Sequence, residues 1–184
     1  PGLGTIQPSQ ADYFQTTKGG GHGDYRLIVL APYSVQEMVD FVGLGMDMAF
    51  KYRNPVMILS DGIIGQMMEK VVLPEQKPRH TDEEIAASCP WATTGHTPDK
   101  RSIITSLELD SAVMEQNNLR FQEKYRKIEE NEIRYEETMT EDADYVLVAF
   151  GSSARICQKV VQVARQEGLK VGLVRPITLW PYPY

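Results

Sequence analysis

Two short apolar runs, separated by a segment with helical periodicity, are the strongest constraint on the fold. The runs are "RLIVLA" (26–31) and "VMILS" (56–60), and each has the length and composition of a buried strand. Ser34 and Glu37 have the spacing of a capping box, and Pro55 disfavours helix in the residue before it. Two apolar strands joined by an amphipathic helix predict a βαβ unit with a parallel sheet. The apolar positions at helical spacing are Val35, Met38, Val39, Val42, Met46, Ala49 and Phe50.

A second α/β pattern occupies the C-terminal part. "DYVLVAF" and "KVGLVRP" predict strands, and "GSSARICQKVVQVARQE" between them predicts a helix. Ser152 or Ser153 is expected to cap the start of this helix, and Gly168 is expected just beyond its end. One face of the helix is expected to carry Ile156, Val160, Val163 and Ala164.

The middle of the chain is polar. Four prolines interrupt residues 74–101, which we interpret as an inter-domain linker. Asp110 or Ser111 is expected to cap a long charged helix that runs to about Glu137, with Glu123 and Lys127 paired at i,i+4. Its buried face is expected to carry Tyr125, Ile128 and Phe121.

This pattern predicts three segments: an α/β layer over 1–72, a linker and connecting helix over 73–141, and a second α/β piece over 142–184. The chain opens on "PGLG" without a Met and stops after "LWPYPY", so we expect a fragment of a longer polypeptide. A missing N-terminal half is expected to leave apolar strand and helix faces of the first layer uncovered unless another chain fills them.

Composition excludes several functional classes. The formal net charge of the 184 residues is -6 and no basic stripe is present, which argues against nucleic acid as a partner. No apolar run reaches the ~18 residues of a membrane span, and no secretory signal opens the chain, so we expect a cytoplasmic protein. Cys89 and Cys157 are the only cysteines, too few for a disulfide framework or an iron–sulfur cluster held by this chain alone.

No metal site is predicted. "SDGIIG" (60–65) invites comparison with the metal–diphosphate motif of thiamine enzymes, but Ser60 replaces the first glycine and no Asn follows at the required distance. Asp61 is instead expected to cap the segment that follows it. The three histidines lack the spacing of metal ligands: His22, His80 and His96.

"TTKGGGHGDYR" (16–26) is either a surface turn or a loop that faces a ligand. Beside Asp24, His22 either polarises a substrate carbonyl or pairs with that carboxylate to stiffen the turn. "FGSSAR" (150–155) is a generic anion site at a helix N-terminus, although a purely structural strand-to-helix turn is favoured.

Longer segments resemble one family. "PGLGTIQPSQADYFQTTKGGGHGDYRLIVLAPYSVQEM" and "KYRNPVMILSDGIIGQMME" resemble the second half of the pyrimidine-binding domain of 2-oxoacid:ferredoxin oxidoreductases, closest to the alpha-type chain of the 2-oxoisovalerate branch. "NLRFQEKYRKIEENEIRYEE", "DADYVLVAFGSSARI" and "GLKVGLVRPITLWPYP" resemble the connector and the start of a transketolase C-terminal-like domain. The resemblance implies an α/β fold with a partial parallel sheet, followed by the start of a second α/β domain.

The resemblance also implies a reaction: oxidative decarboxylation of a 2-oxoacid to an acyl-coenzyme A, with reduction of ferredoxin. The implied cofactor is thiamine diphosphate, shared with a beta-type subunit. Mg²⁺ and the iron–sulfur clusters are expected on the beta-type and ferredoxin-like partner subunits. The organic chemistry belongs to the cofactor, while the protein orients it.

In the family, the glutamate on the aminopyrimidine and the arginine facing the substrate precede this region, so the catalytic residues are expected upstream of Pro1. The residues that the resemblance brings near cofactor or substrate are Gly2, Leu3, Gly4, Thr5, Gln7, His22, Gly23 and Asp24. Two other functional classes stay open: a non-catalytic nucleotide- or anion-binding α/β module that uses "GSSAR", and a structural assembly module.

Overall fold

The structure is a computed structural model that describes residues 11–21, 25–93 and 102–184. The chain divides into two compact units, one of residues 1–73 with 118–184 and one of residues 74–117. The predicted domains over 1–72, 73–141 and 142–184 stay a prediction.

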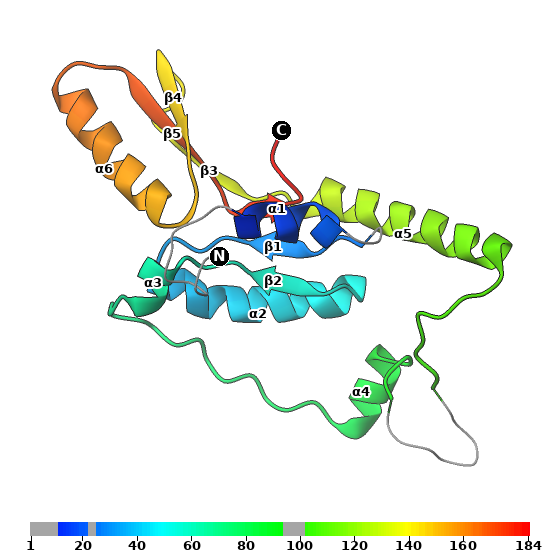
Figure 1. The fold of residues 1–184 in the computed structure, drawn as a ribbon. Coiled ribbons are helices and arrows are strands. Elements are labelled where there is room, and N and C mark those ends of the chain that lie inside the picture. The colour runs from blue at the N-terminus through cyan, green and yellow to red at the C-terminus, as the bar shows by residue number, and fades with distance from the viewer. Residues whose placement is uncertain (1–10, 22–24, 94–101) are drawn as a thin grey trace. The chain divides into compact units, whose positions relative to one another are not determined.

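The first sheet contains the predicted βαβ unit. Strand β1 (Ile28–Leu30) pairs in parallel with β2 (Val56–Ile58), and α2 (Val35–Tyr52) connects them (Figure 1). On its other side β1 pairs antiparallel with β6 (Thr178–Trp180), so the strand order is β2-β1-β6. β1 is therefore the central strand, and it is wholly buried.

The ends of α2 follow from the local sequence. The Ser34 hydroxyl accepts a hydrogen bond from the Glu37 N–H at 3.2 Å, which satisfies one free donor of the first turn. The predicted capping box is only half formed, because the Glu37 carboxylate accepts from the Tyr33 N–H and binds Arg175 instead. Arg53 ends the helix in the left-handed conformation, two residues before Pro55.

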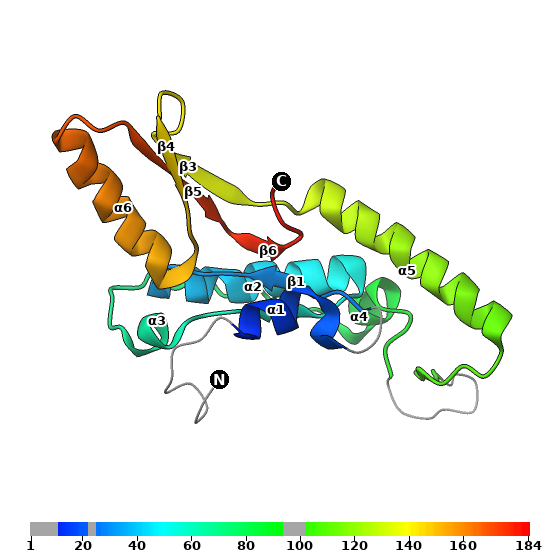
Figure 2. The ribbon, with the colours of Figure 1, turned by 45° about the horizontal axis from the view of Figure 1, so that its top comes forward.

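The second sheet has the order β3-β5-β4. Strands β4 (Tyr145–Val148) and β5 (Val171–Pro176) are parallel and are joined by α6 (Gly151–Gln166), which lies along the sheet (Figure 2). The third strand, β3 (Tyr135–Thr138), pairs antiparallel with β5. Both α/β patterns are confirmed, within small mixed sheets.

The predicted end of the long helix is wrong. Helix α5 (Ser111–Asn131) stops before Glu137, and residues 135–138 form β3 instead. The backbone of "YEET" binds the free edge of β5, and this long-range pairing overrides the local preference of a Glu-rich segment. Asp110 caps α5, since its carboxylate accepts from the Ala112 and Val113 N–H groups.

Three short elements complete the first unit: α1 (Ala11–Thr17), the 3-10 turn η1 (Gly19–Gly21) and α3 (Gly62–Gln66). In the second unit, α4 (Asp82–Ser88) interrupts the predicted linker. Thr81 and Glu84 form a complete capping box at its start, which explains why a helix forms within this polar stretch.

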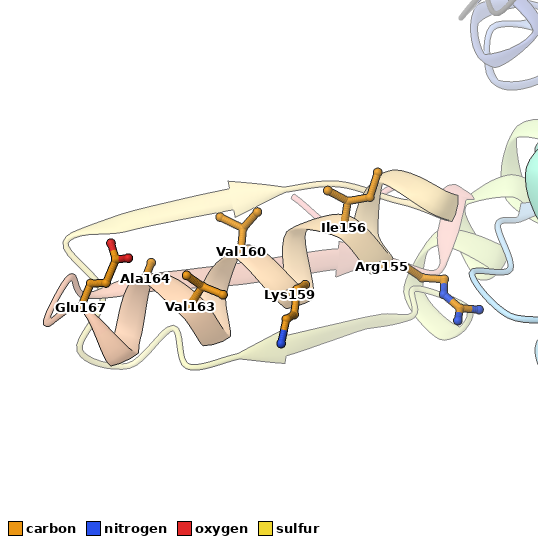
Figure 3. A pocket seen from close by; sticks show the side chains of 7 residues that line it. All are labelled: Arg155, Ile156, Lys159, Val160, Val163, Ala164 and Glu167. Atoms are coloured by element: carbon orange, nitrogen blue, oxygen red, sulfur yellow. The ribbon is translucent and has the colours of Figure 1, made fainter.

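The apolar stripe of α6 is exposed to solvent. Ile156, Val160 and Val163 are 64%, 46% and 41% exposed. Figure 3 shows their side chains following one another along the helix. A shallow pocket of about 650 Å³ follows this stripe, with Lys159 and Glu167 among its lining residues. The opposite face is buried through Ala154 and Val161. The expectation of uncovered apolar faces concerned the first layer, where Val42, Met46 and Phe50 of α2 are 55%, 54% and 53% exposed.

The core of the first unit surrounds β1. Helix α2 contributes Phe41 and Met48, α5 contributes Tyr125 and Ile128, and β6 contributes Leu179 and Trp180. The Tyr125 and Trp180 rings meet edge to face with centroids 5.7 Å apart. The prediction of a buried Phe121 is wrong, since its side chain is 39% exposed, although its ring stacks on Tyr125 with centroids 6.5 Å apart.

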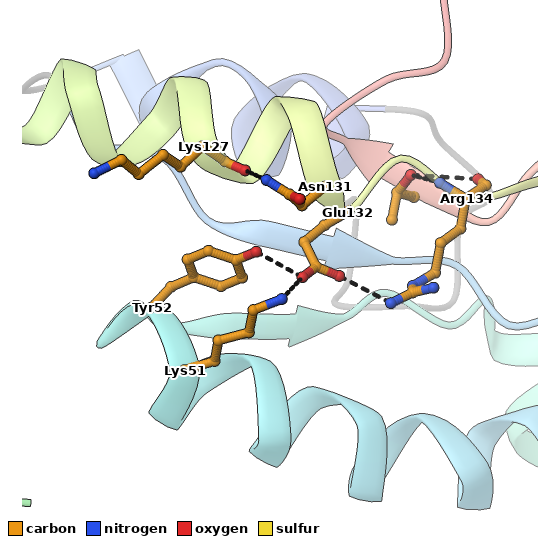
Figure 4. Close-up of polar contacts among 7 residues, drawn as sticks. Lys51, Tyr52, Lys127, Asn131, Glu132 and Arg134 are labelled. Carbon is orange, nitrogen blue, oxygen red and sulfur yellow. Dashed lines mark hydrogen bonds and ion pairs between the residues drawn. The ribbon is translucent and has the colours of Figure 1, made fainter.

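A buried carboxylate ties α2 to the chain just after α5. The Glu132 side chain is 3% exposed and accepts hydrogen bonds from Lys51 Nζ at 2.7 Å and from the Tyr52 hydroxyl at 2.7 Å. Its second oxygen accepts from Arg134 Nη2 at 2.8 Å (Figure 4). Burial alone would raise the pKa of Glu132, but the hydrogen bonds from Lys51 and Tyr52 outweigh it and hold the pKa below 4.5.

We predict that this carboxylate makes the stability of the chain fall in acid. Because the folded-state pKa of Glu132 is depressed, its stabilisation is complete above the unfolded-state pKa and is lost as the pH falls through the folded-state pKa. Glu132→Gln should lower the free energy of unfolding at pH 7 by roughly 1.5–3 kcal/mol and flatten its decline in acid. Urea unfolding across a pH series measures both effects.

Glu123→Gln is the matched control, because Glu123 pairs with Lys127 at 2.9 Å on the exposed side of α5. Exposed pairs of this kind contribute about 0.3–0.5 kcal/mol. Equal losses for the two variants would contradict the role assigned to Glu132.

Candidate functional site

Every residue that the sequence placed near cofactor or substrate lies outside the described residues. The set is Gly2, Leu3, Gly4, Thr5, Gln7, His22, Gly23 and Asp24. The structure describes the chain on both sides of His22, Gly23 and Asp24. The turn η1 precedes these three residues, and Tyr25 and Arg26 follow them.

The backbone conformation of η1 requires glycine at two of its three positions. Gly19 and Gly20 have φ values of +76° and +61°, which side chains rarely adopt. A Cβ at Gly20 would also collide with the Tyr25 hydroxyl, and one at Gly19 would lie 3.0 Å from Arg26 Nη1. The turn therefore packs on the segment that follows it. Arg26 is fixed in turn, because its N–H donates to the Tyr125 hydroxyl at 3.2 Å.

Asp61 follows β2 at the carboxyl end of the parallel pair, where α/β sheets commonly bind ligands. One oxygen accepts from the Ile64 N–H at 3.0 Å, so the predicted cap of the following segment is confirmed. The other accepts from the Ser152 N–H at 2.7 Å, in the first turn of α6. Burial would raise the pKa of Asp61, but these backbone N–H groups outweigh it and hold the pKa below 3.8.

The serine cap predicted for α6 is wrong. Phe150 is the N-cap residue and makes no side-chain hydrogen bond there. The acceptor comes from Asp61, far away in the sequence, and no local signal marks it. The same contact fills the anion site predicted for "FGSSAR", because a carboxylate already lies at this helix N-terminus.

The described residues do not fit the metal–diphosphate end of thiamine diphosphate. Both oxygens of Asp61 already accept backbone hydrogen bonds. Within ranges 11–21, 25–93 and 102–184, no three His, Cys, Asp or Glu side chains come together to hold a metal ion.

Sequence reasoning missed two ion pairs that join the first 142 residues to β5 and α6. Arg175 is fully buried and binds Glu37 through two nitrogens at 3.0 and 2.8 Å, and its guanidinium lies 3.9 Å from the centre of the Tyr33 ring. Arg155 binds Glu69 at 2.7 Å. Arginine side chains usually lie at the protein surface, so nothing in the local sequence indicated that Arg175 and Arg155 would form these ion pairs.

The described helices include none that is both long and apolar enough to cross a bilayer. Cys89 and Cys157, both in the described part of the chain, are free thiols.

Comparison with known proteins gives the same family along the whole chain. Residues 1–142 match the thiamine diphosphate-binding domain of pyruvate flavodoxin/ferredoxin oxidoreductases, and residues 143–184 match core domain II of pyruvate:ferredoxin oxidoreductase.

Individual relatives agree with this assignment. The chain is 51% identical to the ketoisovalerate oxidoreductase subunit VorB of Methanothermobacter marburgensis over 183 residues, covering 100% of this chain and 51% of the relative. It is 36% identical to the 2-oxoglutarate synthase subunit KorA of Methanocaldococcus jannaschii, covering 99% of this chain and 55% of the relative. The chain thus spans about half the length of these relatives.

A solved structure has the same fold. The 2-oxoglutarate:ferredoxin oxidoreductase from Magnetococcus marinus, with 2-oxoglutarate, coenzyme A and succinyl-CoA bound, superposes with a TM-score of 0.71 at 25% identity. The match covers 96% of this chain and 34% of that one. The chain therefore belongs to the pyruvate flavodoxin/ferredoxin oxidoreductase family, through its matches to the thiamine diphosphate-binding domain and to core domain II.

Proposed function

We propose that this chain is part of a subunit of a thiamine diphosphate-dependent 2-oxoacid:ferredoxin oxidoreductase that acts on 2-oxoisovalerate. The reaction is oxidative decarboxylation of the 2-oxoacid to an acyl-coenzyme A, with two electrons passed to ferredoxin. The observation that carries the proposal is 51% identity to a ketoisovalerate oxidoreductase subunit over the whole chain. The identity to a 2-oxoglutarate synthase subunit is 36%.

In this proposal the chain contributes the pyrimidine side of a shared cofactor site. Mg²⁺ and the diphosphate are proposed to bind to a beta-type partner subunit, as the family resemblance implies. A ferredoxin-like subunit carries the iron–sulfur clusters, and the enzyme works in the cytoplasm. The segments proposed to line the mouth of the site contain Gly2, Leu3, Gly4, Thr5, Gln7, His22, Gly23 and Asp24.

The anion-binding alternative loses its support. It required free N–H groups at the start of α6, and the Asp61 carboxylate already accepts from the Ser152 N–H there. A second carboxylate or a phosphate at this position would meet the negative charge of Asp61.

Activity of the complete enzyme tests the proposal. The full-length subunit, assembled with its partners, should reduce ferredoxin in a reaction that needs both a 2-oxoacid and coenzyme A. We expect kcat/KM for 2-oxoisovalerate to exceed that for 2-oxoglutarate and pyruvate by at least about tenfold, or roughly 1.4 kcal/mol in transition-state binding. A higher kcat/KM for 2-oxoglutarate would contradict the proposed substrate. If ferredoxin is not reduced with any 2-oxoacid, the proposed function itself is wrong.

His22 is the residue whose role is most open. In the assembled enzyme, His22→Ala should lower the rate of acyl-coenzyme A formation about 10²-fold or more, if its imidazole takes part in proton transfer or polarises the substrate carbonyl. The melting temperature should change little. An unchanged rate with a lower melting temperature would assign His22 to the structure of the loop instead.

The 184 residues alone should bind thiamine diphosphate negligibly. Each charge-assisted hydrogen bond lost with the ligands of Mg²⁺ and the diphosphate costs roughly 1.5–3 kcal/mol of binding free energy. Each 1.4 kcal/mol corresponds to about tenfold in affinity. Calorimetric titration with thiamine diphosphate and Mg²⁺, on protein that circular dichroism shows to be folded, measures this. Micromolar binding would mean that the anchor lies in this chain after all.

A further inference from the structure

Carboxylates of residues 1–142 bind donors in residues 143–184 at two places. Glu136 and Asp142 bind Arg175 and Arg165 beside the second sheet. Three others come from the βαβ unit of the first sheet and the chain that follows it. Glu37, Asp61 and Glu69 belong to the segment that matches the thiamine diphosphate-binding domain, residues 1–142. Each binds a donor in the segment that matches core domain II, residues 143–184. Glu37 binds Arg175 at 2.8 Å, and Glu69 binds Arg155 at 2.7 Å. Asp61 accepts from the first turn of α6 at 2.7 Å.

The charges at this junction are complementary. The βαβ side presents Glu37, Asp61 and Glu69, and α6 and β5 present two guanidinium groups together with the positive end of the α6 dipole. One of these guanidinium groups, Arg175, also binds Glu136 of β3 at 2.9 Å. Each carboxylate is also held on its own side. Glu37 accepts from the Tyr33 N–H at 3.0 Å, and Glu69 accepts from the Val35 N–H at 3.0 Å. The acceptors are therefore oriented before the second segment binds them.

We propose that Glu37, Asp61 and Glu69 form a carboxylate latch that fixes α6 and β5 of core domain II against the carboxyl ends of β1 and β2. The three are positioning residues: they contact α6 and β5 of the second segment, and they act on the reaction through the orientation of that segment.

Gly151 shows that the latch constrains the backbone as well. It has a φ of +59°, and a Cβ added there would lie 2.7 Å from Asp61 Oδ2. A glycine is thus required for two reasons, its conformation and the close approach of the carboxylate. Beside this contact the Tyr13 ring stacks on Phe150 with centroids 5.7 Å apart, so apolar packing holds the same turn from another side.

Partial burial makes the latch stronger than a surface ion pair. The Arg175 side chain is 2% exposed and that of Glu37 is 17% exposed. The side chains of Glu69 and Arg155 are 26% and 35% exposed. Removing one member of a partly desolvated pair leaves its partner without compensation, whereas an exposed pair is readily replaced by water.

Hydrogen exchange in the full-length subunit, within the assembled enzyme, tests the latch without using activity. Asp61→Ala and Glu69→Gln should each speed exchange of the first-turn amides of α6 by at least tenfold, while amides of β1 change less than twofold. Arg155→Ala should speed the exchange of these α6 amides as much as Glu69→Gln does. The double variant Glu69→Gln with Arg155→Ala should exchange no faster than either single variant. Arg155→Lys, which keeps the ion pair, should restore slow exchange.

Coupling between Asp61 and Gly151 is the second measurement. Gly151→Ala should destabilise the wild type more than it destabilises the Asp61→Ala variant, because only the wild type retains the carboxylate that meets the new Cβ. Additive effects would contradict direct contact across the junction. Glu123→Gln, which removes an exposed ion pair on α5, is the matched control and should leave α6 exchange unchanged.

The catalytic consequence rests on the proposed function. Asp61→Ala and Glu69→Gln should lower kcat at least fivefold and change KM for the 2-oxoacid less than twofold, because neither side chain is proposed to contact the substrate. Unchanged exchange in α6 would overturn the latch whatever the activity. Faster exchange with unchanged kcat would overturn its positioning role alone, and absence of activity in the wild type would count against the proposed function only.

Discussion

The pairing of β6 with β1 is the constraint on which the rest of the first unit depends. β1 has only three residues and lies between β2 and β6, so most of its backbone partners come from segments distant in the sequence. The Ala31 N–H extends the pairing by donating to the Ile177 carbonyl at 2.8 Å. Because β5 ends at Pro176 and β6 begins at Thr178, the pairing of β6 also fixes the end of β5, and Arg175 meets Glu37 at the start of α2. The short antiparallel pair thus determines which groups can meet at the family-domain junction.

Polar contacts complete what this pairing begins. A buried arginine is costly unless its donors are matched, and Arg175 meets both Glu37 and Glu136 while its flat face covers Tyr33. The buried carboxylate of Glu132 is compensated in the same way, because it accepts hydrogen bonds from Lys51, Tyr52 and Arg134. These clusters add little apolar burial, but they are directional, so they select one orientation of the elements they join.

How much of this the sequence predicts depends on whether the signal is local. The βαβ unit was predictable because the apolar runs, the Ser34 cap and Pro55 all favour the same structure. Helix α4 was also predictable in principle, since Thr81 and Glu84 have capping-box spacing within a polar stretch. By contrast, "YEET" becomes a strand only because β5 offers it an edge. The cap of α6 comes from Asp61, whose partner Ser152 is 91 positions away. Interactions at that separation leave no pattern in a single sequence.

Asp61 also shows why a motif must be judged by what its atoms bind. "SDGIIG" differs from the metal–diphosphate motif by few residues, and a carboxylate after a buried strand is a common place for a metal ligand. A carboxylate oxygen that already accepts a short N–H hydrogen bond must lose that bond before it can bind a cation, and both oxygens of Asp61 are in this state. Displacing them would free the first turns of α3 and α6 together. The position therefore holds the first turns of two helices of the chain in place.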